Sequence, residues 1–364
     1  MDIGVLGLNH RTAPVEFRER LAFQVEKLPH ALSAVRQELD VPECVILSTC
    51  NRVELYTLLP ARDGVQGRLK EFLSRFHHVD LRDSDSHFYW YSQPDSVRHL
   101  FRVTAGLDSM VVGESEILGQ VREAYTQAVS CGSVGGTFHR FFQTAIRTGK
   151  EVRAKTRIGQ GATSVSSVAV ELARRIFQDL ASKTIMIVGA GQVGESTLHY
   201  LKGQGVRSVL VANRSMDAAG PLAEAVGGQA VSLTELEEYL PKADIVIGST
   251  AADHYLLTRE HVRRAMTVRR QRPLFFIDIS VPRNLDPQIG QIENVYLYDI
   301  DDLEGIASAN LRMRLNEVEA CSAIIEEQLT DFMGRLQQGV IASGAKQSLF
   351  KNEIATSALR ASSQ

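Results

Sequence analysis

The chain has 364 residues, 44% hydrophobic and 23% charged, a composition typical of a soluble globular protein with two or three domains. A formal net charge of −3 excludes a general electrostatic attraction to nucleic acid, so any such contact must be local. Four scattered cysteines with no zinc-like spacing argue against a metal site and favour a reducing compartment. Because no signal-peptide pattern or membrane-spanning apolar run is evident, we expect a cytoplasmic protein.

Residues 1–160 are predicted to form an α+β domain. The strands are expected over 3–8, 44–48, 53–59 and 87–91, and the first two helices over 24–39 and 65–77. The order βαββαβ is typical of ferredoxin-like folds, in which two helices cover one antiparallel sheet. Further helices are expected at about 94–104, 115–130 and 138–157.

The turn between the second and third strands carries a cysteine. Cys50 lies on a predicted polar corner at one end of the sheet, two residues before Arg52. A reactive cysteine is partly exposed in an electropositive setting that favours the thiolate, whereas a structural cysteine is buried and inert. The pattern therefore predicts that Cys50 is a nucleophile and that Arg52 favours its thiolate. The Arg52 guanidinium could also hold a substrate carboxylate through two hydrogen bonds.

A second, dinucleotide-binding domain is predicted over 161–300, with a connecting helix within 161–182. Strand 184–188 runs into Gly189, Gly191 and Gly194 and then into a helix. A strand before and a helix after such glycines are the context of a dinucleotide-binding fingerprint. Strands at 208–213, 243–250 and 273–280 alternate with helices, which indicates a doubly wound parallel sheet of the Rossmann type.

The end of the second strand of this sheet indicates the dinucleotide. NAD sites usually carry an acid there, which binds the ribose 2′-hydroxyl, but this chain has Asn213, Arg214 and Ser215. An arginine can pair with a 2′-phosphate, so we expect NADPH; the alternative is an arginine merely solvated on a loop. The expected cofactor-binding residues are Gly189, Ala190, Gly191, Gln192, Val193, Gly194, Asn213, Arg214 and Ser215.

Residues 301–338 are predicted to form a long amphipathic helix. Its apolar residues recur at intervals of three and four from Leu311 to Leu336, and such a stripe needs a partner within the chain or in another subunit. We expect the stripe to be left uncovered and to join two subunits. Residues 339–364 are small, polar and weakly patterned, and are expected to form an atypical tail.

Five motifs together closely resemble the glutamyl-tRNA reductase family. They are GLNHRTAPVEFRERLAF, LSTCNRVELY, GLDSMVVGESEILGQV, VGAGQVG and DISVPRNLDP, and the resemblance covers about residues 3–337. It implies an NADPH-dependent reduction of glutamyl-tRNA(Glu) to glutamate-1-semialdehyde through a Cys50 thioester, the first step of the C5 route to 5-aminolevulinate and tetrapyrroles. It also implies a homodimer joined by C-terminal helices and suggests product handover to glutamate-1-semialdehyde aminomutase.

The resemblance implies specific site residues as well. Cys50 would be the nucleophile and His99 a second catalytic residue, although a histidine on a half-apolar helix is more often a packed side chain. The implied substrate contacts are Thr49, Asn51, Arg52, Ser109, Glu114, Ser115, Glu116 and Gln120. The family usually reads GEPQILGQ where this chain reads GESEILGQ, so Glu116 adds an acid near an anionic substrate. The family's C-terminal helical region is also longer than this chain supplies.

Two alternatives remain open at this stage. The nucleotide-binding half also resembles shikimate and quinate dehydrogenases, which reduce small acids without a covalent intermediate; a non-enzymatic nucleotide-sensing or tRNA-binding module is the third possibility. For tRNA, a basic face is predicted on the helix over 138–157, although a solvated helix face is at least as good an interpretation. That face would carry Arg140, Arg147, Lys150, Arg153 and Arg157.

Overall fold

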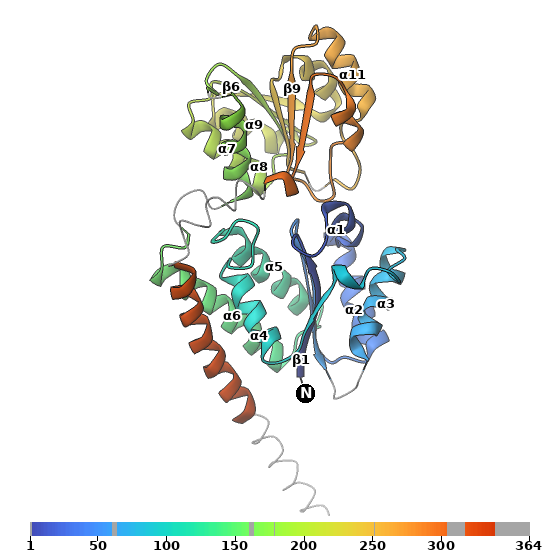
Figure 1. Ribbon diagram of the computed structural model, residues 1–364, viewed down its shortest axis with the longest axis vertical. Coiled ribbons are helices and arrows are strands. Elements are labelled where there is room, and N and C mark those ends of the chain that lie inside the picture. Colours follow the sequence, from blue (N-terminus) through green and yellow to red (C-terminus); the bar gives the residue numbers. More distant parts are fainter. Residues whose placement is uncertain are drawn as a thin grey trace, which may run out of the picture.

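The computed structural model describes residues 2–59, 64–159, 164–177, 179–250, 252–303 and 317–338. Two α/β domains meet end to end, and a long C-terminal helix runs beside the first domain (Figure 1). This mixed α/β architecture confirms the predicted fold class. None of the described helices combines the length and apolar character needed to cross a membrane.

The first domain is built on a four-stranded antiparallel sheet in the order β2-β3-β1-β4. Its strands are β1 (Asp2–Asn9), β2 (Cys44–Ser48), β3 (Arg52–Leu59) and β4 (Tyr89–Tyr91). Strand β3 is buried at all eight positions because helices cover both faces of the sheet. Helices α2 (Leu28–Leu39) and α3 (Val65–His77) lie on one side; α4 (Asp95–Thr104), α5 (Glu116–Ser130) and α6 (Gly136–Lys155) lie on the other (Figure 1).

Most of these elements agree with the predictions, and three differ. The bounds of β2 and α3 match. Helix α2 begins at Leu28, four residues later than expected, because residues 25–27 form a short 3-10 helix, and β4 begins two residues later because residues 85–87 form another. The unpredicted helix α1 (Val15–Leu21) follows β1 and lies at the end of the domain that meets the second domain (Figure 1). With only seven residues, α1 is too short for its periodicity to stand out in the sequence.

The second domain contains six parallel strands in the order β10-β9-β8-β5-β6-β7. They are β5 (Thr184–Val188), β6 (Ser208–Asn213), β7 (Gln229–Ser232), β8 (Ile245–Gly248), β9 (Leu274–Asp278) and β10 (Val295–Asp299). This is the doubly wound dinucleotide-binding order, whose switch point lies between β5 and β8. The expected parallel sheet is confirmed, and β7 and β10 extend it at its edges.

Helices cover both faces of this sheet, and the side chains of β5 alternate between them. Ile185 and Ile187 pack into one core with α7 (Val165–Phe177), α8 (Gln192–Gly203) and α9 (Met216–Ala225). Met186 and Val188 pack into a second core with α10 (Leu236–Tyr239) and α11 (Arg259–Val268). Burial on both faces explains why the strands read as nearly continuous apolar runs.

A C-terminal helix over residues 317–338 packs against the first domain. Cys321, Ile325, Leu329 and Phe332 are each at most 5% exposed and belong to the core of that domain. The Phe332 ring contacts Phe101 of α4 and Phe141 of α6, with centroid distances of 6.1 and 5.7 Å. The expectation that this apolar stripe is left uncovered is therefore wrong, because α4 and α6 of the same chain cover it. Leu311, the start of the predicted stripe, and the 339–364 tail lie outside the described residues.

The two domains contact each other through ion pairs next to α1. Arg18, 1% exposed, donates from Nη2 to Oδ1 of Asp301 over 2.8 Å, and its Nε donates to the main-chain oxygen of Cys50 over 3.3 Å. Arg283 donates to Oε1 of Glu19 over 2.8 Å and to Oε1 of Glu16 over 2.9 Å. These contacts hold the end of the second domain's sheet against the turn that carries Cys50.

Candidate active site

Cys50 lies in the tight turn between β2 and β3, and its side chain is partly buried. The main-chain N–H of Thr49 donates to the oxygen of Arg52 over 2.9 Å, which closes the turn. The N–H of Asn51 donates to Oγ1 of Thr49 over 3.2 Å, and the N–H of His10 donates to the oxygen of Asn51 over 2.9 Å. The turn is therefore fixed by its own hydrogen bonds and by β1, which gives the thiol a defined position.

A cavity of about 720 Å³ between the two domains brings the predicted sites together. Cys50 and Gln120 line it from the first domain, and the glycine-rich turn lines it from the second. Asn213 and Arg214 at the end of β6 also face this cavity, together with residues at the ends of β8 and β9. The thiol and the dinucleotide-binding turn, which are far apart in the sequence, thus share one space.

The geometry of the three glycines fits a bound dinucleotide. Gly189 has φ +118°, a conformation that favours glycine, and a side chain at Gly194 would place its Cβ 2.2 Å from the oxygen of Gly189. A Cβ at Gly191, in contrast, would have no heavy atom within 4 Å, so the backbone there is open on that side. These are the roles of tight turn, close helix packing and phosphate approach. Helix α8 begins directly after Gly191, and its N-terminal N–H groups can bind a phosphate.

The end of β6 carries no acid and one unpaired arginine. Arg214 is exposed and forms no ion pair with any part of the chain that the structure describes. Asn213 donates from Nδ2 to the main-chain oxygen of Ser215 over 3.1 Å and so shapes this corner. Ser215 precedes α9 and Gly194 is packed on the turn, so neither of these two predicted residues lines the cavity.

A buried polar cluster lies behind the Cys50 turn, centred on Glu54 of β3. This carboxylate has no exposure and accepts from Nη1 of Arg52 over 2.6 Å and from the hydroxyls of Tyr56 and Tyr89 over 2.5 Å each. Nε2 of His99 lies 2.8 Å from it. Burial alone would raise the pKa of Glu54, but the neighbouring His99 and Arg52 hold that pKa well below its ordinary value. Glu54 therefore stays ionised inside the cluster, where the Arg52 guanidinium compensates its charge.

The position of Arg52 corrects the expected electrostatics of the thiol. Its guanidinium is 1% exposed and donates to Glu54 and to both the main-chain and carboxylate oxygens of Asp108. Burial, followed by Glu114 and Glu116, raises the pKa of the Cys50 thiol to about 12, while Arg18 lowers it. The expected electropositive setting is therefore wrong, because β3 directs Arg52 into the buried cluster rather than toward the thiol.

The segment between α4 and α5 supplies the remaining predicted contacts. Burial and the nearby Glu116 raise the pKa of Glu114 to about 7, and the Ser109 hydroxyl lowers it. Burial also raises the pKa of the half-buried Glu116 at the start of α5. Arg153 of α6 donates to the main-chain oxygens of Gly113 and Glu114, so it anchors this segment instead of facing solvent with the other basic residues of α6.

The structure thus places the predicted residues in two layers. Cys50 and Gln120 line the cavity. Thr49, Asn51, Ser109, Glu114 and Glu116 lie in the segments beside it, whereas Ser115 is exposed. Oδ1 of Asn51 is buried without a hydrogen-bond partner among the described residues, and Asn51 does not line the cavity. His99, 8% exposed, does not line the cavity; it lies against the rings of Tyr89 and Tyr91 at 5.3 and 5.1 Å.

Three residues of this site escaped the sequence reasoning: Arg18, Glu54 and Asp108. A signal for one of them was present. Glu54 follows Arg52 by two residues on a strand, which places both side chains on the same face of an otherwise apolar, buried segment. A charged pair in that position must be hydrogen-bonded internally, because an unpaired buried charge is very unfavourable.

Comparisons with known proteins agree with this division into domains. Residues 6–156 match the family model "Glutamyl-tRNAGlu reductase, N-terminal domain", and residues 171–306 match "Shikimate / quinate 5-dehydrogenase". The glutamyl-tRNA reductase of Geotalea uraniireducens is 44% identical over 335 residues, which cover 91% of this chain and 76% of the relative. That of Moorella thermoacetica is 46% identical over 333 residues, with the same coverage.

The chain belongs to the glutamyl-tRNA reductase family. The solved structure of the glutamyl-tRNA reductase from Methanopyrus kandleri matches with a TM-score of 0.50 and 37% identity, over 92% of this chain and 80% of that one. The likeness to shikimate dehydrogenases is confined to the nucleotide-binding domain, so it does not extend to the Cys50 domain. A dehydrogenase-type domain of this kind implies a nicotinamide cofactor.

Proposed function

We propose that this chain catalyses the NADPH-dependent reduction of glutamyl-tRNA(Glu) to glutamate-1-semialdehyde, the entry step of tetrapyrrole biosynthesis. The observation that carries the proposal is the shared cavity: Cys50 and the dinucleotide-binding turn line the same space. A nucleophilic thiol beside a hydride-donor site fits the reduction of an activated acyl group through a covalent intermediate.

The chemistry balances in two steps. The Cys50 sulfur attacks the ester carbonyl carbon of the charged tRNA; the bond to the ribose oxygen breaks, and the tRNA leaves with a free hydroxyl. NADPH, when bound, supplies a hydride to the thioester carbon. The carbon–sulfur bond then breaks, Cys50 regains its thiolate, and the aldehyde is released. In the first step the thiol loses its proton, and the leaving ribose oxygen takes up one proton to become the free hydroxyl.

Several residues are proposed to position the acyl group. Oδ1 of Asn51, next to Cys50 in the turn, has no hydrogen-bond partner among the residues that the structure describes, and this acceptor suits the substrate ammonium group. Gln120 lines the cavity beside Cys50 and can donate to the substrate. Arg52 is proposed to attract the substrate carboxylate from behind the turn, together with Thr49, Ser109, Glu114, Ser115 and Glu116 as neighbouring contacts. His99 is proposed as a catalytic residue whose orientation is fixed by Glu54.

The choice of NADPH rests on the corner after β6. Arg214 is exposed beside the cavity without an ion-pair partner among the described residues, and no acid takes the place that would bind a 2′-hydroxyl. A planar guanidinium can pair with a 2′-phosphate. Gly189, Ala190, Gly191, Gln192 and Val193 would hold the pyrophosphate and the adjacent ribose.

The proposed roles follow the division of the chain into domains. We assign residues 1–160 to catalysis and tRNA binding, 161–300 to NADPH binding, and 301–338 to the C-terminal helix. A homodimer through this helix remains a proposal, and it must use the exposed face or residues outside the described ranges, because the stripe at 321–332 is buried. Product handover to glutamate-1-semialdehyde aminomutase is likewise a proposal.

Trapping the intermediate tests the function. We expect the full chain, incubated with glutamyl-tRNA and without NADPH, to gain one glutamyl group on Cys50, detected by peptide mass spectrometry. Cys50→Ser should gain none at this position, because a serine hydroxyl is a much weaker nucleophile. Cys131→Ser is the matched control, since Cys131 is also partly buried but lies outside the cavity. If the unmodified protein gains no glutamyl group on Cys50, the mechanism is contradicted.

A further inference from the structure

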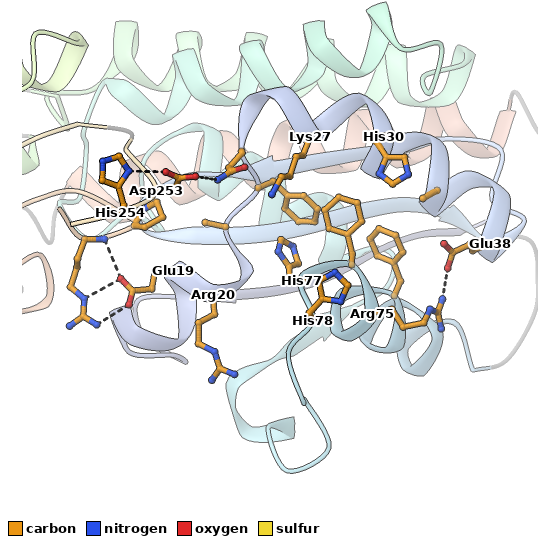
Figure 2. Close-up of a pocket in the computed structure, with 18 of the residues that line it drawn as sticks. Glu19, Arg20, Lys27, His30, Glu38, Arg75, His77, His78, Asp253 and His254 are labelled. Carbon is orange, nitrogen blue, oxygen red and sulfur yellow. Dashed lines mark hydrogen bonds and ion pairs between the residues drawn. The ribbon is translucent and has the colours of Figure 1, made fainter. Parts of the chain in front are cut away.

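A second groove of about 880 Å³ lies between the domains, beside the Cys50 cavity (Figure 2). Residues of α1, α2 and α3 form one wall of the groove, and the loops after β8 and β9 form the opposite wall. Gln24, Asp253 and His254 line both this groove and the Cys50 cavity. At this shared boundary Nε2 of Gln24 donates to Oδ2 of Asp253 over 3.0 Å and so joins the two walls. The groove therefore adjoins the cavity that Cys50 lines.

Aromatic rings form the centre of the groove. Phe76 contacts Phe23, Phe72 and His30 with centroid distances of 5.3, 5.4 and 5.7 Å. His30 is exposed, and its ring is tilted by 31° against the partly buried ring of Phe76, so the pair leaves aromatic surface open to a planar ligand. Exposed aromatic faces of this kind are what bind unpaired nucleic-acid bases, because every base can stack on them.

The charges of the groove favour an anion. Glu19 is paired with Arg283 and Glu38 with Arg75. Asp253 accepts from Gln24 and lies beside His254. Arg20 and Lys27 are exposed and have no side-chain hydrogen bond or ion pair with any residue that the structure describes. Figure 2 shows Lys27 and His30 close to the aromatic rings, so the unpaired Lys27 ammonium group and the stacking surface occur together. Burial lowers the pKa of His77 to about 4, so this histidine adds no charge near neutral pH.

We propose that this groove binds the unpaired 3′ end of the tRNA while the acyl group attached to it reaches Cys50. The inference rests on the proposed function and adds a location for the acceptor end. The opening on the other side of Cys50 is bounded by the glycine-rich turn and Arg214, which bind the dinucleotide, so a polynucleotide substrate needs a separate approach. In this arrangement bases stack on His30 and Phe76, and Lys27 and Arg20 contact the phosphates between them.

Binding of two RNAs tests the location. The probes are uncharged glutamate-specific tRNA and the same tRNA without its single-stranded 3′ nucleotides, at one fixed salt concentration. We expect Arg20→Ala/Lys27→Ala to weaken binding of the complete tRNA about five- to ten-fold and to leave binding of the truncated tRNA unchanged. His30→Ala should weaken only the complete tRNA, by about five-fold or more, because one stacking face is lost. All three positions are exposed, so the fold should tolerate the changes.

The matched control is Arg207→Ala/Arg259→Ala, which removes two exposed charges from the second domain, away from the groove. We expect it to bind both RNAs like the unmodified chain. Equal losses for both RNAs in the groove variants would mean that the groove contacts the duplex part of the tRNA, and unchanged binding would mean that it serves another ligand; either result overturns the proposal.

The covalent assay separates this proposal from the proposed function. If the unmodified chain acquires no glutamyl group on Cys50, the function itself fails. If it does, the groove variants should need about five- to ten-fold more charged tRNA for half-maximal labelling. An unchanged requirement would reject the groove and leave the function intact.

Discussion

Nε2 of His99 lies 2.8 Å from Oε1 of Glu54, a carboxylate with no solvent exposure. The same carboxylate also binds Arg52, so one buried charge fixes two residues that the family resemblance assigns to the site. Glu54 therefore joins β3 to α4 directly behind the Cys50 turn. We regard it as a positioning residue, because it acts through His99 and Arg52.

Replacing Glu54→Gln should lower the free energy of unfolding by about 3–5 kcal/mol, because one partner of a buried ion pair is removed and Arg52 loses charge compensation. Urea denaturation of the purified chain measures this. The control, Glu71→Gln, changes an exposed glutamate of α3 and should stay within about 0.5 kcal/mol. If both variants unfold like the unmodified chain, Glu54 does not hold the cluster together.

Glu114 should make stability depend on pH. Its folded-state pKa of about 7 lies above the ordinary value of 4.5, so the folded chain binds its proton more tightly than the unfolded chain does. The protonated Glu114 carboxyl therefore contributes to the free energy of unfolding in full below pH 4.5, and this contribution is lost as the pH rises through 7. Between pH 5 and pH 8, the free energy of unfolding of Glu114→Gln should therefore rise by up to about 3 kcal/mol relative to that of the unmodified chain. Equal pH profiles for the two proteins would contradict this assignment.

The same Glu114→Gln variant should also make the thiol more reactive. The Glu114 carboxylate raises the pKa of Cys50, so removing its charge increases the thiolate fraction at a given pH. We expect faster alkylation of Cys50 at pH 7.5, measured peptide by peptide with iodoacetamide. Glu123→Gln, an exposed position on α5, is the control and should not change the rate.

Arg214→Ala should discriminate between the two nicotinamide cofactors. Loss of a charge-assisted pair with a 2′-phosphate costs about 1.5–3 kcal/mol, or roughly one to two orders of magnitude in the dissociation constant for NADPH. NADH, which lacks that phosphate, should bind as before. Arg207→Ala is the control. Equal losses for both cofactors would mean that Arg214 supports the loop and does not read the phosphate.

The C-terminal helix should stabilise the domain on which it packs. Ile325 is 1% exposed against the catalytic core, so Ile325→Ala should lower the free energy of unfolding by about 2–4 kcal/mol. Sedimentation velocity should show the same oligomeric state for this variant and for Glu327→Ala, a change on the exposed face. If Ile325→Ala alone dissociates an assembly without lowering the free energy of unfolding, the stripe forms an interface between subunits instead.

What the sequence could predict depended on how local each signal was. The turn at Gly189–Gly194 and the Cys50 corner are encoded within a few residues, and both were placed correctly. Of the two partners of Arg52, Glu54 could have been predicted, because it is two residues away on the same face of β3. Asp108 could not, because it lies 56 residues away and reaches Arg52 only through the fold. The stripe around Ile325 was correctly read as apolar and helical. Periodicity reveals that such a face is covered but not what covers it, so the choice of another subunit was unsupported.

The contact between Arg18 and Asp301 bears on the fate of the acyl group. Arg18 holds the main chain of Cys50 with one nitrogen and Asp301, at the end of the second domain, with another. If the chain forms the proposed thioester, this contact holds it toward the glycine-rich turn, where the cofactor would donate a hydride. Loosening the contact would let water reach the thioester, and hydrolysis would then release free glutamate and waste the aminoacylation of the tRNA that has already left. Weakening the Arg18–Asp301 pair, one of several contacts between the domains, should therefore shift the product from aldehyde toward free acid.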